Sequence, residues 1–311
     1  MKLVRQINFD HQPLKIKFSR DGSHLLAASR QQIVSCLIAQ TSEEVRIEAG
    51  FVLDVAFLSD EEIVAAIWTA NPLETRKTLA IFDIKTQHIT SAVITGDVRS
   101  VCVHPQRKRI FAGRISEYGT YGYIGVYDFA LNQQNEFKTE YIAFEMAISY
   151  SDDKLAIANG SGLLELWNIS TDWEQIATGY DPENDCTGNP CEVCAVDITP
   201  DGRYAVVGLY GGKNACFVID GGSGDIVGWY GPQSDGDETF IQMGRVAISP
   251  DGSYVAIAPT YATTVCVYRV SDGTISHEYE IDHCEALAFS PIGDILAIGG
   301  EKSVTLWSFK G

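Results

Sequence analysis

The sequence predicts an all-β fold, a seven-bladed β-propeller with four antiparallel strands in each blade. Three observations predict it: a strand–turn–strand unit recurs along the chain, equivalent positions in successive copies are 39 to 50 residues apart, and apolar residues alternate within each copy. That spacing is the length expected for one four-stranded blade. The seven copies are Lys15–Ala28, Asp54–Ala66, Ser100–Gly113, Glu145–Ala158, Ala195–Gly208, Arg245–Ala258 and Ala286–Gly299.

The first strand of each copy alternates apolar residues with a period of two. Val196 and Ile198 fall on one face, as do Val246 and Ile248 in the next copy. The position between them is mostly small, as at Ala247, which is typical of strands that crowd together near the axis of a ring.

A tight turn follows the first strand. Ser249–Gly252 reads Ser-Pro-Asp-Gly and Thr199–Gly202 reads Thr-Pro-Asp-Gly. Proline pre-sets φ, aspartate accepts hydrogen bonds from the backbone ahead of it, and glycine tolerates a left-handed conformation. We therefore expect the second strand to return antiparallel to the first.

A third apolar strand follows in every copy, and an outer fourth strand comes next, for example over residues 226–230 and 276–280. The last copy lacks a fourth strand, whereas Leu3–Asn8 precedes the first copy as an additional one. We expect this N-terminal strand to complete the C-terminal blade, which closes the ring and leaves no open sheet edge. Residues 1–311 are expected to form a single domain.

The chain resembles the WD-repeat β-propellers over essentially its whole length. The closest match to the family's third-strand ending is Leu166–Ile169, followed by Ile81–Ile84 and Val126–Asp128. The literal Trp-Asp pair and the Gly-His dipeptide of the family are absent from all seven copies. The resemblance implies a seven-bladed interaction scaffold whose blades are held by burial more than by the family's His–Asp–Trp hydrogen bonds.

The charge balance is strongly acidic. The chain has 23 Lys and Arg against 41 Asp and Glu, for a formal net charge of −18 and a pI near 4.6. Nucleic acids and anionic membranes both attract basic surfaces, so neither is expected as a partner. An acidic field favours a protein or peptide partner with a basic surface, although acidic residues also serve simply to keep a repeat protein in solution.

The chain has no apolar run of signal-peptide type in its first ten residues and no stretch approaching 18 apolar residues. We therefore expect a cytoplasmic protein. A propeller that is itself monomeric within a hetero-complex fits this composition.

Eight cysteines are too sparse for a secreted disulfide scaffold. Five of them lie in or next to predicted strands and are interpreted as small core residues: Cys36, Cys102, Cys216, Cys266 and Cys284. The remaining run, Cys186, Cys191 and Cys194, has a C-x4-C-x2-C spacing that leaves free thiols, a metal site and a Cys186–Cys191 disulfide all open. We predict no cofactor and no metal site.

The long connections are predicted to lie on one face. Turns between strands one and two, or three and four, are short, whereas the long segments join strands two and three or join successive blades. These segments are Trp68–Lys77, Arg114–Tyr123, Gly179–Cys191, Leu209–Asn214, Gly231–Gln242 and Pro259–Thr264. Insertions gathered on one face of a repeat ring usually mark its binding face.

Aromatic residues beside carboxylates populate these connections, and such a mixture suits recognition of a protein or peptide surface that carries Lys or Arg. The predicted partner-binding residues are Trp68, Tyr118, Tyr121, Tyr123, Tyr210, Tyr230, Asp235, Asp237, Glu238 and Tyr261.

No catalytic residue is predicted. Enzyme propellers usually place catalytic or metal-binding residues where the first strands meet the central channel. In this chain those positions are Lys15, Asp54, Ser100, Glu145, Ala195, Arg245 and Ala286. The two acids and two cations of this channel ring indicate mutual charge pairing rather than a metal cage. The six histidines are scattered and are interpreted as structural, and the chain has no nucleophile elbow, phosphate loop or zinc-protease motif.

The leading functional hypothesis is a non-catalytic interaction scaffold or adaptor that binds a protein or peptide through the long-connection face, as one subunit of a larger complex. The alternative is a propeller hydrolase or lyase acting on a small molecule at the central channel. That alternative needs Asp54 and Glu145 to bind a divalent ion. A third hypothesis is a subunit that regulates a partner enzyme, and the sequence does not distinguish it from the scaffold.

Overall fold

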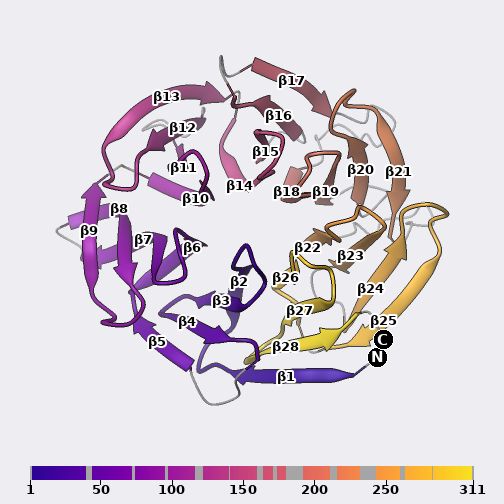
Figure 1. Cartoon of the computed structure of the whole chain (residues 1–311), viewed down its shortest axis with the longest axis horizontal. Helices are drawn as coiled ribbons and strands as arrows, with labels where there is room; N and C mark the ends of the chain where they lie inside the picture. Colours follow the sequence, from indigo (N-terminus) through magenta and orange to yellow (C-terminus); the bar gives the residue numbers. More distant parts are fainter. Residues whose placement is uncertain are drawn as a thin grey trace. The chain divides into compact units, whose positions relative to one another are not determined.

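The computed structural model of the chain contains seven four-stranded antiparallel sheets, which confirms the predicted all-β, seven-bladed propeller (Figure 1). The structure describes residues 2–39, 44–71, 74–94, 97–115, 122–139, 141–159, 164–170, 174–179, 192–210, 216–231, 243–259, 263–281 and 283–309.

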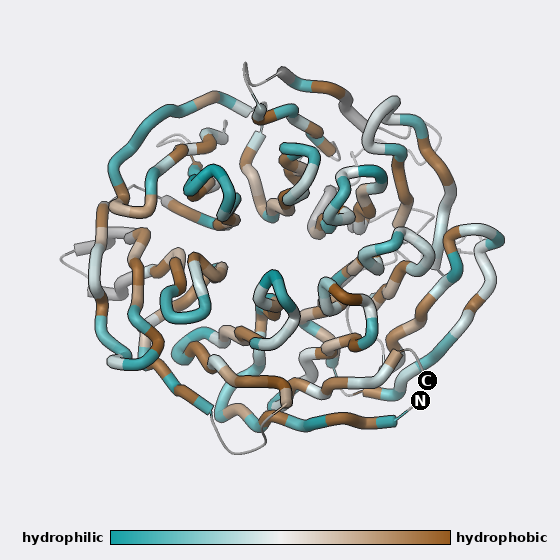
Figure 2. The backbone as a smooth tube through the Cα atoms, in the orientation of Figure 1, coloured by the Kyte–Doolittle hydropathy of each residue, from teal (hydrophilic) through white to brown (hydrophobic). Residues whose placement is uncertain are grey.

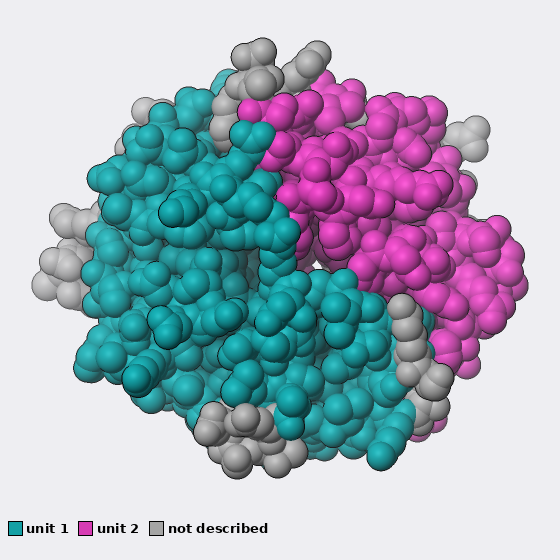
Figure 3. Space-filling view, viewed as in Figure 1, with its two compact units in different colours: residues 1–143, 290–311 teal, residues 144–289 magenta. Residues whose placement is uncertain are grey.

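The chain divides into two compact units, residues 1–143 with 290–311 and residues 144–289, coloured separately in Figure 3.

The first unit holds three complete sheets, with strand orders β2-β3-β4-β5, β6-β7-β8-β9 and β10-β11-β12-β13. Their strands are β2 (Pro13–Phe18), β3 (His24–Ser29), β4 (Gln32–Leu37), β5 (Glu44–Glu48), β6 (Phe51–Phe57), β7 (Glu62–Asn71), β8 (Glu74–Asp83), β9 (Ile89–Ile94), β10 (Asp97–His104), β11 (Arg109–Ile115), β12 (Gly122–Tyr127) and β13 (Gln133–Thr139).

The second unit holds the sheets β14-β15-β16-β17, β18-β19-β20-β21 and β22-β23-β24-β25. Their strands are β14 (Ala143–Ile148), β15 (Lys154–Asn159), β16 (Leu164–Asn168), β17 (Glu174–Gly179), β18 (Glu192–Ile198), β19 (Tyr204–Tyr210), β20 (Cys216–Asp220), β21 (Ile226–Tyr230), β22 (Met243–Ile248), β23 (Tyr254–Pro259), β24 (Thr264–Arg269) and β25 (Ile275–Glu280).

The seventh sheet has the strand order β1-β28-β27-β26 and is built from β1 (Leu3–Asn8), β26 (Ala286–Phe289), β27 (Ile295–Gly299) and β28 (Ser303–Ser308). Strand β1 runs antiparallel to β28, with Gln6 opposite Thr305. This pairing confirms that the N-terminal strand completes the last blade. That residues 1–311 make one domain stays a prediction.

The turn between strands one and two is a small hydrogen-bonded unit. In the β22–β23 turn the Ser249 hydroxyl donates to Asp251 Oδ1 at 2.6 Å, and the Tyr254 N–H donates to Ser249 Oγ at 2.9 Å. Gly252 has a φ of +70° and donates its N–H to the Ser249 carbonyl. The Ser/Thr-x-Asp-Gly sequence therefore specifies this hairpin through its side chains.

The core of each unit lies between neighbouring sheets. In the first unit one apolar cluster joins the β2–β5 and β6–β9 sheets and contains Ile33, Ile63 and Phe82. In the second unit a comparable cluster joins β14–β17 to β18–β21 around Leu166 and Phe217. Figure 2 shows the resulting alternation, with brown strands and teal tips at the β2–β3 and β10–β11 turns.

In two blades the third strand ends with a tryptophan whose indole N–H is hydrogen-bonded within the same strand. The Trp167 Nε1–H donates to Glu165 Oε2 at 2.9 Å, and the Trp307 Nε1–H donates to Thr305 Oγ1 at 3.1 Å. In each pair the acceptor precedes the tryptophan by two residues, so both side chains share a face of the strand. The indole N–H therefore has a hydrogen-bond acceptor in its own strand, although the aspartate of a Trp-Asp pair is absent.

The first strands of five sheets carry a shift in register at the same place. It lies just before the residue that opens each repeated copy, at Pro13/Lys15, Val52/Asp54, Val98/Ser100, Val193/Ala195 and Met243/Arg245. A bulge re-aims the side chains that follow it.

Candidate functional site

The predicted partner-binding set is only partly visible. Trp68, Tyr123, Tyr210 and Tyr230 belong to described strands. The others lie outside the described residues: Tyr118, Tyr121, Asp235, Asp237, Glu238 and Tyr261.

Trp68 is the exposed member of a small aromatic cluster on the β6–β9 sheet. Its side chain is 37 % exposed, and its ring meets Phe51 edge-on, with centroids 5.4 Å apart. The Arg30 guanidinium lies 5.6 Å from the centroid of the Phe51 ring. We call Arg30, Phe51 and Trp68 the Trp68 patch.

Register explains why the Trp68 patch forms. Phe51 and Trp68 are direct cross-strand partners at the start of β6, and Arg30 lies in the adjoining β3–β4 turn. Arg30 and the Phe51–Trp68 pair lie at the same end of their blades. At this end strands two and three are joined and the chain passes to the next blade. This long-connection end is the one that the sequence predicted to bind.

The predicted loop Trp68–Lys77 is wrong as a loop. Strands β7 and β8 continue through it, with Trp68 opposite Lys77 and Asn71 opposite Glu74. The segment is polar and was therefore interpreted as a connection, but its threonines are β-branched and favour extended backbone. The extension makes Trp68 part of a hydrogen-bonded ladder.

The ends of other predicted connections are also strand. Residues 114–115 belong to β11 and 122–123 to β12, while Leu209 and Tyr210 end β19. In these blades the sheets extend further toward the long-connection end than the apolar pattern predicts, because backbone pairing continues beyond the buried residues.

Tyr123 and Tyr230 have different environments. Tyr123 is half-buried in β12, opposite Arg114 on one side and Lys138 on the other. Tyr230 is buried, and its hydroxyl donates to the Val270 carbonyl at 2.8 Å. Its ring also packs against Tyr268 in the neighbouring sheet, so Tyr230 joins two blades.

Sequence reasoning missed two exposed aromatics, Tyr141 just before β14 and Phe144 as the second residue of β14. Tyr141 is 44 % exposed and Phe144 is 40 % exposed. The Thr139 hydroxyl donates to the Tyr141 carbonyl at 2.7 Å, which fixes the backbone there. The connection from β13 to β14 that carries Tyr141 is too short to stand out in the sequence as an insertion.

Three of the channel-ring residues, Asp54, Ser100 and Arg245, make structural contacts. Asp54 is fully buried, and its two carboxylate oxygens accept the Val55 and Val101 N–H groups, each at 2.9 Å. The first contact is within β6, and the second reaches β10 of the next blade. The expected charge pairing is therefore wrong for Asp54, because the bulge before it turns the carboxylate toward backbone donors.

Arg245 also differs from the expected pairing within the ring. Its Nη2 lies 3.6 Å from Glu285 Oε2, and its Nε donates to the Glu285 carbonyl. Ser100 is buried and donates to the Ala143 carbonyl at 3.3 Å. These residues tie first strands to their neighbours.

The predicted core cysteines are confirmed as free thiols, of which Cys36, Cys102, Cys216 and Cys284 are buried and Cys266 is half-buried. Burial raises the pKa of Cys36 to about 11 and that of Cys284 to about 12. Such thiols remain protonated at neutral pH and are poor nucleophiles.

Cys186 and Cys191 lie outside the described residues, and Cys194 belongs to β18. The three alternatives for that run, free thiols, a metal site or a Cys186–Cys191 disulfide, therefore stay predictions.

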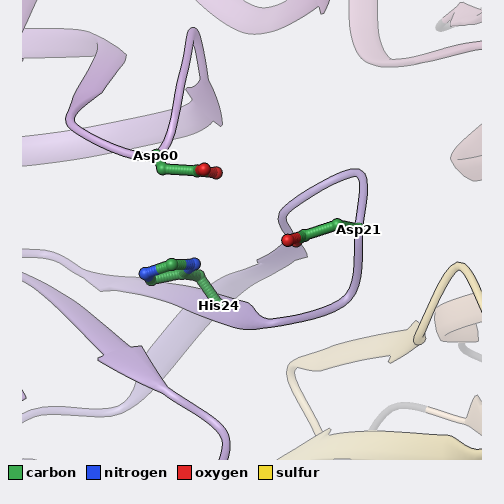
Figure 4. Close-up of side chains that lie close together, drawn as sticks. All are labelled: Asp21, His24 and Asp60. Carbon is green, nitrogen blue, oxygen red and sulfur yellow. The ribbon is translucent and has the colours of Figure 1, made fainter.

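One group of side chains has the composition of a metal site. Asp21, His24 and Asp60 offer one ligand atom each, and these atoms lie within 4.8 Å of one another (Figure 4). The group lies at the opposite end of its blades from the Trp68 patch, at the turns that join strands one and two.

No family model matches the chain, and no curated protein matches it in sequence. The resemblance to WD-repeat proteins therefore stays a prediction, whereas the propeller architecture rests on the strand pairing. Within the described residues no helix has the length and apolar character needed to cross a membrane.

Proposed function

We propose that this protein is a non-catalytic scaffold or adaptor that binds a protein or peptide at the long-connection end of its blades. The observation that carries the proposal is the Trp68 patch, an exposed indole supported by Phe51 and Arg30. The propeller is then one subunit of a larger complex, and the cytoplasm is the proposed compartment.

The physical argument for Trp68 concerns preorganisation. A large side chain that is already ordered before binding loses little conformational entropy when a partner covers it. Trp and Arg are also the residues most enriched among those that dominate binding energy. Trp68 and Arg30 stand together here, with Phe51 as the support between them.

The hydrogen bonds and the burial of the Asp54 carboxylate support a non-catalytic function. An enzyme at the channel would need this carboxylate to bind a divalent ion. Both of its oxygens already accept backbone N–H groups, and the residue is fully buried. Releasing it would leave buried donors without acceptors.

The proposed partner carries a basic surface. The net charge of −18 creates a field that accelerates association with cations and repels polyanions. A basic partner should associate more slowly as salt rises, since exposed charges are screened over about 8 Å at physiological ionic strength.

The experiment begins with a photo-crosslinking amino acid placed at position 68, in cells that express the protein, to identify the partner. Affinity for the purified partner is then measured for the parent, Trp68→Ala and Ile89→Ala. Ile89 is an exposed apolar residue of the same sheet, at the start of β9 and therefore at the short-turn end.

We expect Trp68→Ala to weaken binding by about 30-fold, the equivalent of roughly 2 kcal/mol, and Ile89→Ala to leave it unchanged. Equal affinities for the parent and Trp68→Ala would sink the proposed face, provided that both variants melt at the parent's temperature.

A further inference from the structure

The short-turn ends of the first two blades bring three metal-binding side chains together. Asp21 lies in the β2–β3 turn, His24 is the first residue of β3, and Asp60 lies in the β6–β7 turn. Figure 4 shows the three side chains, with the Asp60 carboxylate reaching from its own turn toward the other two.

The Asp21 carboxylate is held in place by its turn. Its Oδ1 accepts the Ser19 hydroxyl at 2.7 Å and the Ser23 N–H at 2.9 Å. These two hydrogen bonds fix the position of the Asp21 carboxylate within its turn.

The Ser23 hydroxyl connects the Asp21 carboxylate to the His24 imidazole. Ser23 Oγ lies 2.7 and 2.8 Å from the two Asp21 oxygens and 2.8 Å from His24 Nδ1. A hydroxyl has one proton, and a carboxylate can only accept it, so Ser23 Oγ accepts from Nδ1–H. Ser23 thus orients the Asp21 carboxylate and the His24 imidazole together, which is the supporting role usual beside metal-binding histidines.

No lysine or arginine among the residues that the structure describes forms an ion pair with this group. Among the described residues neither Asp21 nor Asp60 forms an ion pair, and Asp60 has no hydrogen bond. Arg20 adjoins Asp21 in sequence, but both Nη atoms lie 2.7 Å from the Gln106 side chain when its amide oxygen is turned toward them. The two carboxylates thus approach one another across the turns without an ion pair to any described lysine or arginine.

The other turns show what is particular to this one. The same Ser/Thr–Asp hydrogen bond occurs at Thr199–Asp201 and Ser249–Asp251, so Asp21 alone follows from turn structure. The position equivalent to His24 is tyrosine in both of those turns, at Tyr204 and Tyr254. The structure of the turn therefore does not account for a histidine at position 24, nor for the position of Asp60 close to Asp21 and His24.

We propose that Asp21, His24 and Asp60 bind a divalent first-row transition metal ion, with Zn²⁺ as the best fit. One imidazole nitrogen and two carboxylate oxygens suit Zn²⁺ better than Ca²⁺ or Mg²⁺, which prefer oxygen donors throughout. Three protein ligands leave a coordination position open to water or to a side chain of a partner. The ion would bridge the turns of two consecutive blades.

The test is isothermal titration of the full chain with Zn²⁺, in a background where Cys186, Cys191 and Cys194 are serine so that thiolates contribute no binding. We expect one site with a Kd below about 0.1 mM, weakened at least tenfold by Asp60→Asn and by His24→Gln. Ser23→Ala should weaken it by about tenfold, since partners that orient a ligand are worth 10–100-fold in metal affinity.

The matched control is Asp201→Asn, which removes the same turn carboxylate where no histidine is present. It should leave Zn²⁺ affinity unchanged. Asp60→Asn is the decisive variant, because the Asp60 side chain makes no hydrogen bond to any residue that the structure describes, so its loss should leave the turn intact. Absence of binding in the parent, or equal binding by the parent and Asp60→Asn, overturns the proposal.

A second readout is the imidazole proton NMR spectrum during the titration. The proposal requires the His24 signals, assigned by their loss in His24→Gln, to shift with the same stoichiometry as the heat. Shifts confined to the other histidines would contradict it.

Discussion

At the scale of single residues, buried polar side chains hold neighbouring blades together through backbone contacts. Asp54 is the clearest case, because one carboxylate serves its own strand and the next blade at once. Asp197 repeats the arrangement in the second unit, where its oxygens accept the Ile198 and Ile248 N–H groups. Asp54 is the first residue of its repeated copy, whereas Asp197 is the third residue of its copy. The same kind of contact between blades therefore forms from two different positions of the repeat.

Asp54→Asn should destabilise the protein by about 2–3 kcal/mol. The substitution puts an amide NH₂ against a backbone N–H and removes a charge-assisted hydrogen bond, which is worth about 1.5–3 kcal/mol. The measurement is the guanidinium unfolding midpoint. Glu61→Gln, an exposed substitution in the following turn, serves as control and should change the free energy of unfolding by less than about 0.5 kcal/mol. A midpoint for Asp54→Asn that equals the control's would contradict the role given to this carboxylate.

At the scale of elements, the hairpin between strands one and two is best specified where its turn carries proline, aspartate and glycine, as at Thr199–Gly202 and Ser249–Gly252. These residues predict the turn from sequence because each acts within four residues. The hydroxyl that opens the turn matters equally, since it both donates to the aspartate and accepts from the second strand.

Ser249→Ala should therefore lower stability by about 1–2 kcal/mol, because the Tyr254 N–H loses its acceptor and Asp251 loses a donor. Ser253→Ala is a matched control, since Ser253 is exposed in the same turn and its hydroxyl makes no hydrogen bond in the described structure. Thermal unfolding of the two variants measures the difference. Equal melting temperatures would show that the turn is held by its backbone alone.

Strand length was less predictable than strand position. The β7–β8 hairpin extends to Asn71 and Glu74, well past the buried residues. Apolar alternation ends where burial ends, but backbone pairing needs no apolar side chain to continue. For this reason the pattern located Trp68 correctly at the long-connection end yet assigned it to a loop.

At the scale of the whole molecule, the acidic charge is the dominant electrostatic property. With a net charge of −18, self-repulsion should destabilise the folded chain at low ionic strength. Raising NaCl from about 10 mM to about 150 mM shortens the Debye length from roughly 30 to 8 Å and should raise the melting temperature. A melting temperature that falls over this range would mean that attractive ion pairs outweigh the net repulsion.

The two proposed sites lie at opposite ends of the blades of the first unit. The Trp68 patch belongs to the long-connection end, and the Asp21–His24–Asp60 group belongs to the short turns. A metal ion at the short turns would not compete with a partner at the Trp68 patch. The two can therefore be tested independently, and loss of one does not predict loss of the other.

The sequence by itself determined the repeat, the number of blades, the turn chemistry and the completion of the last blade by residues 3–8, because each follows from local periodicity and spacing. Only the tertiary structure decided that Asp54 reaches Val101, that Arg30 lies over Phe51 and that Asp60 approaches His24, since these partners come from other strands or turns. Periodicity indicates which residues of one strand share a face, but it carries no information on which side chain of a neighbouring blade comes within a hydrogen-bond length. That depends on bulges and strand ends, which are set by backbone pairing across the sheet.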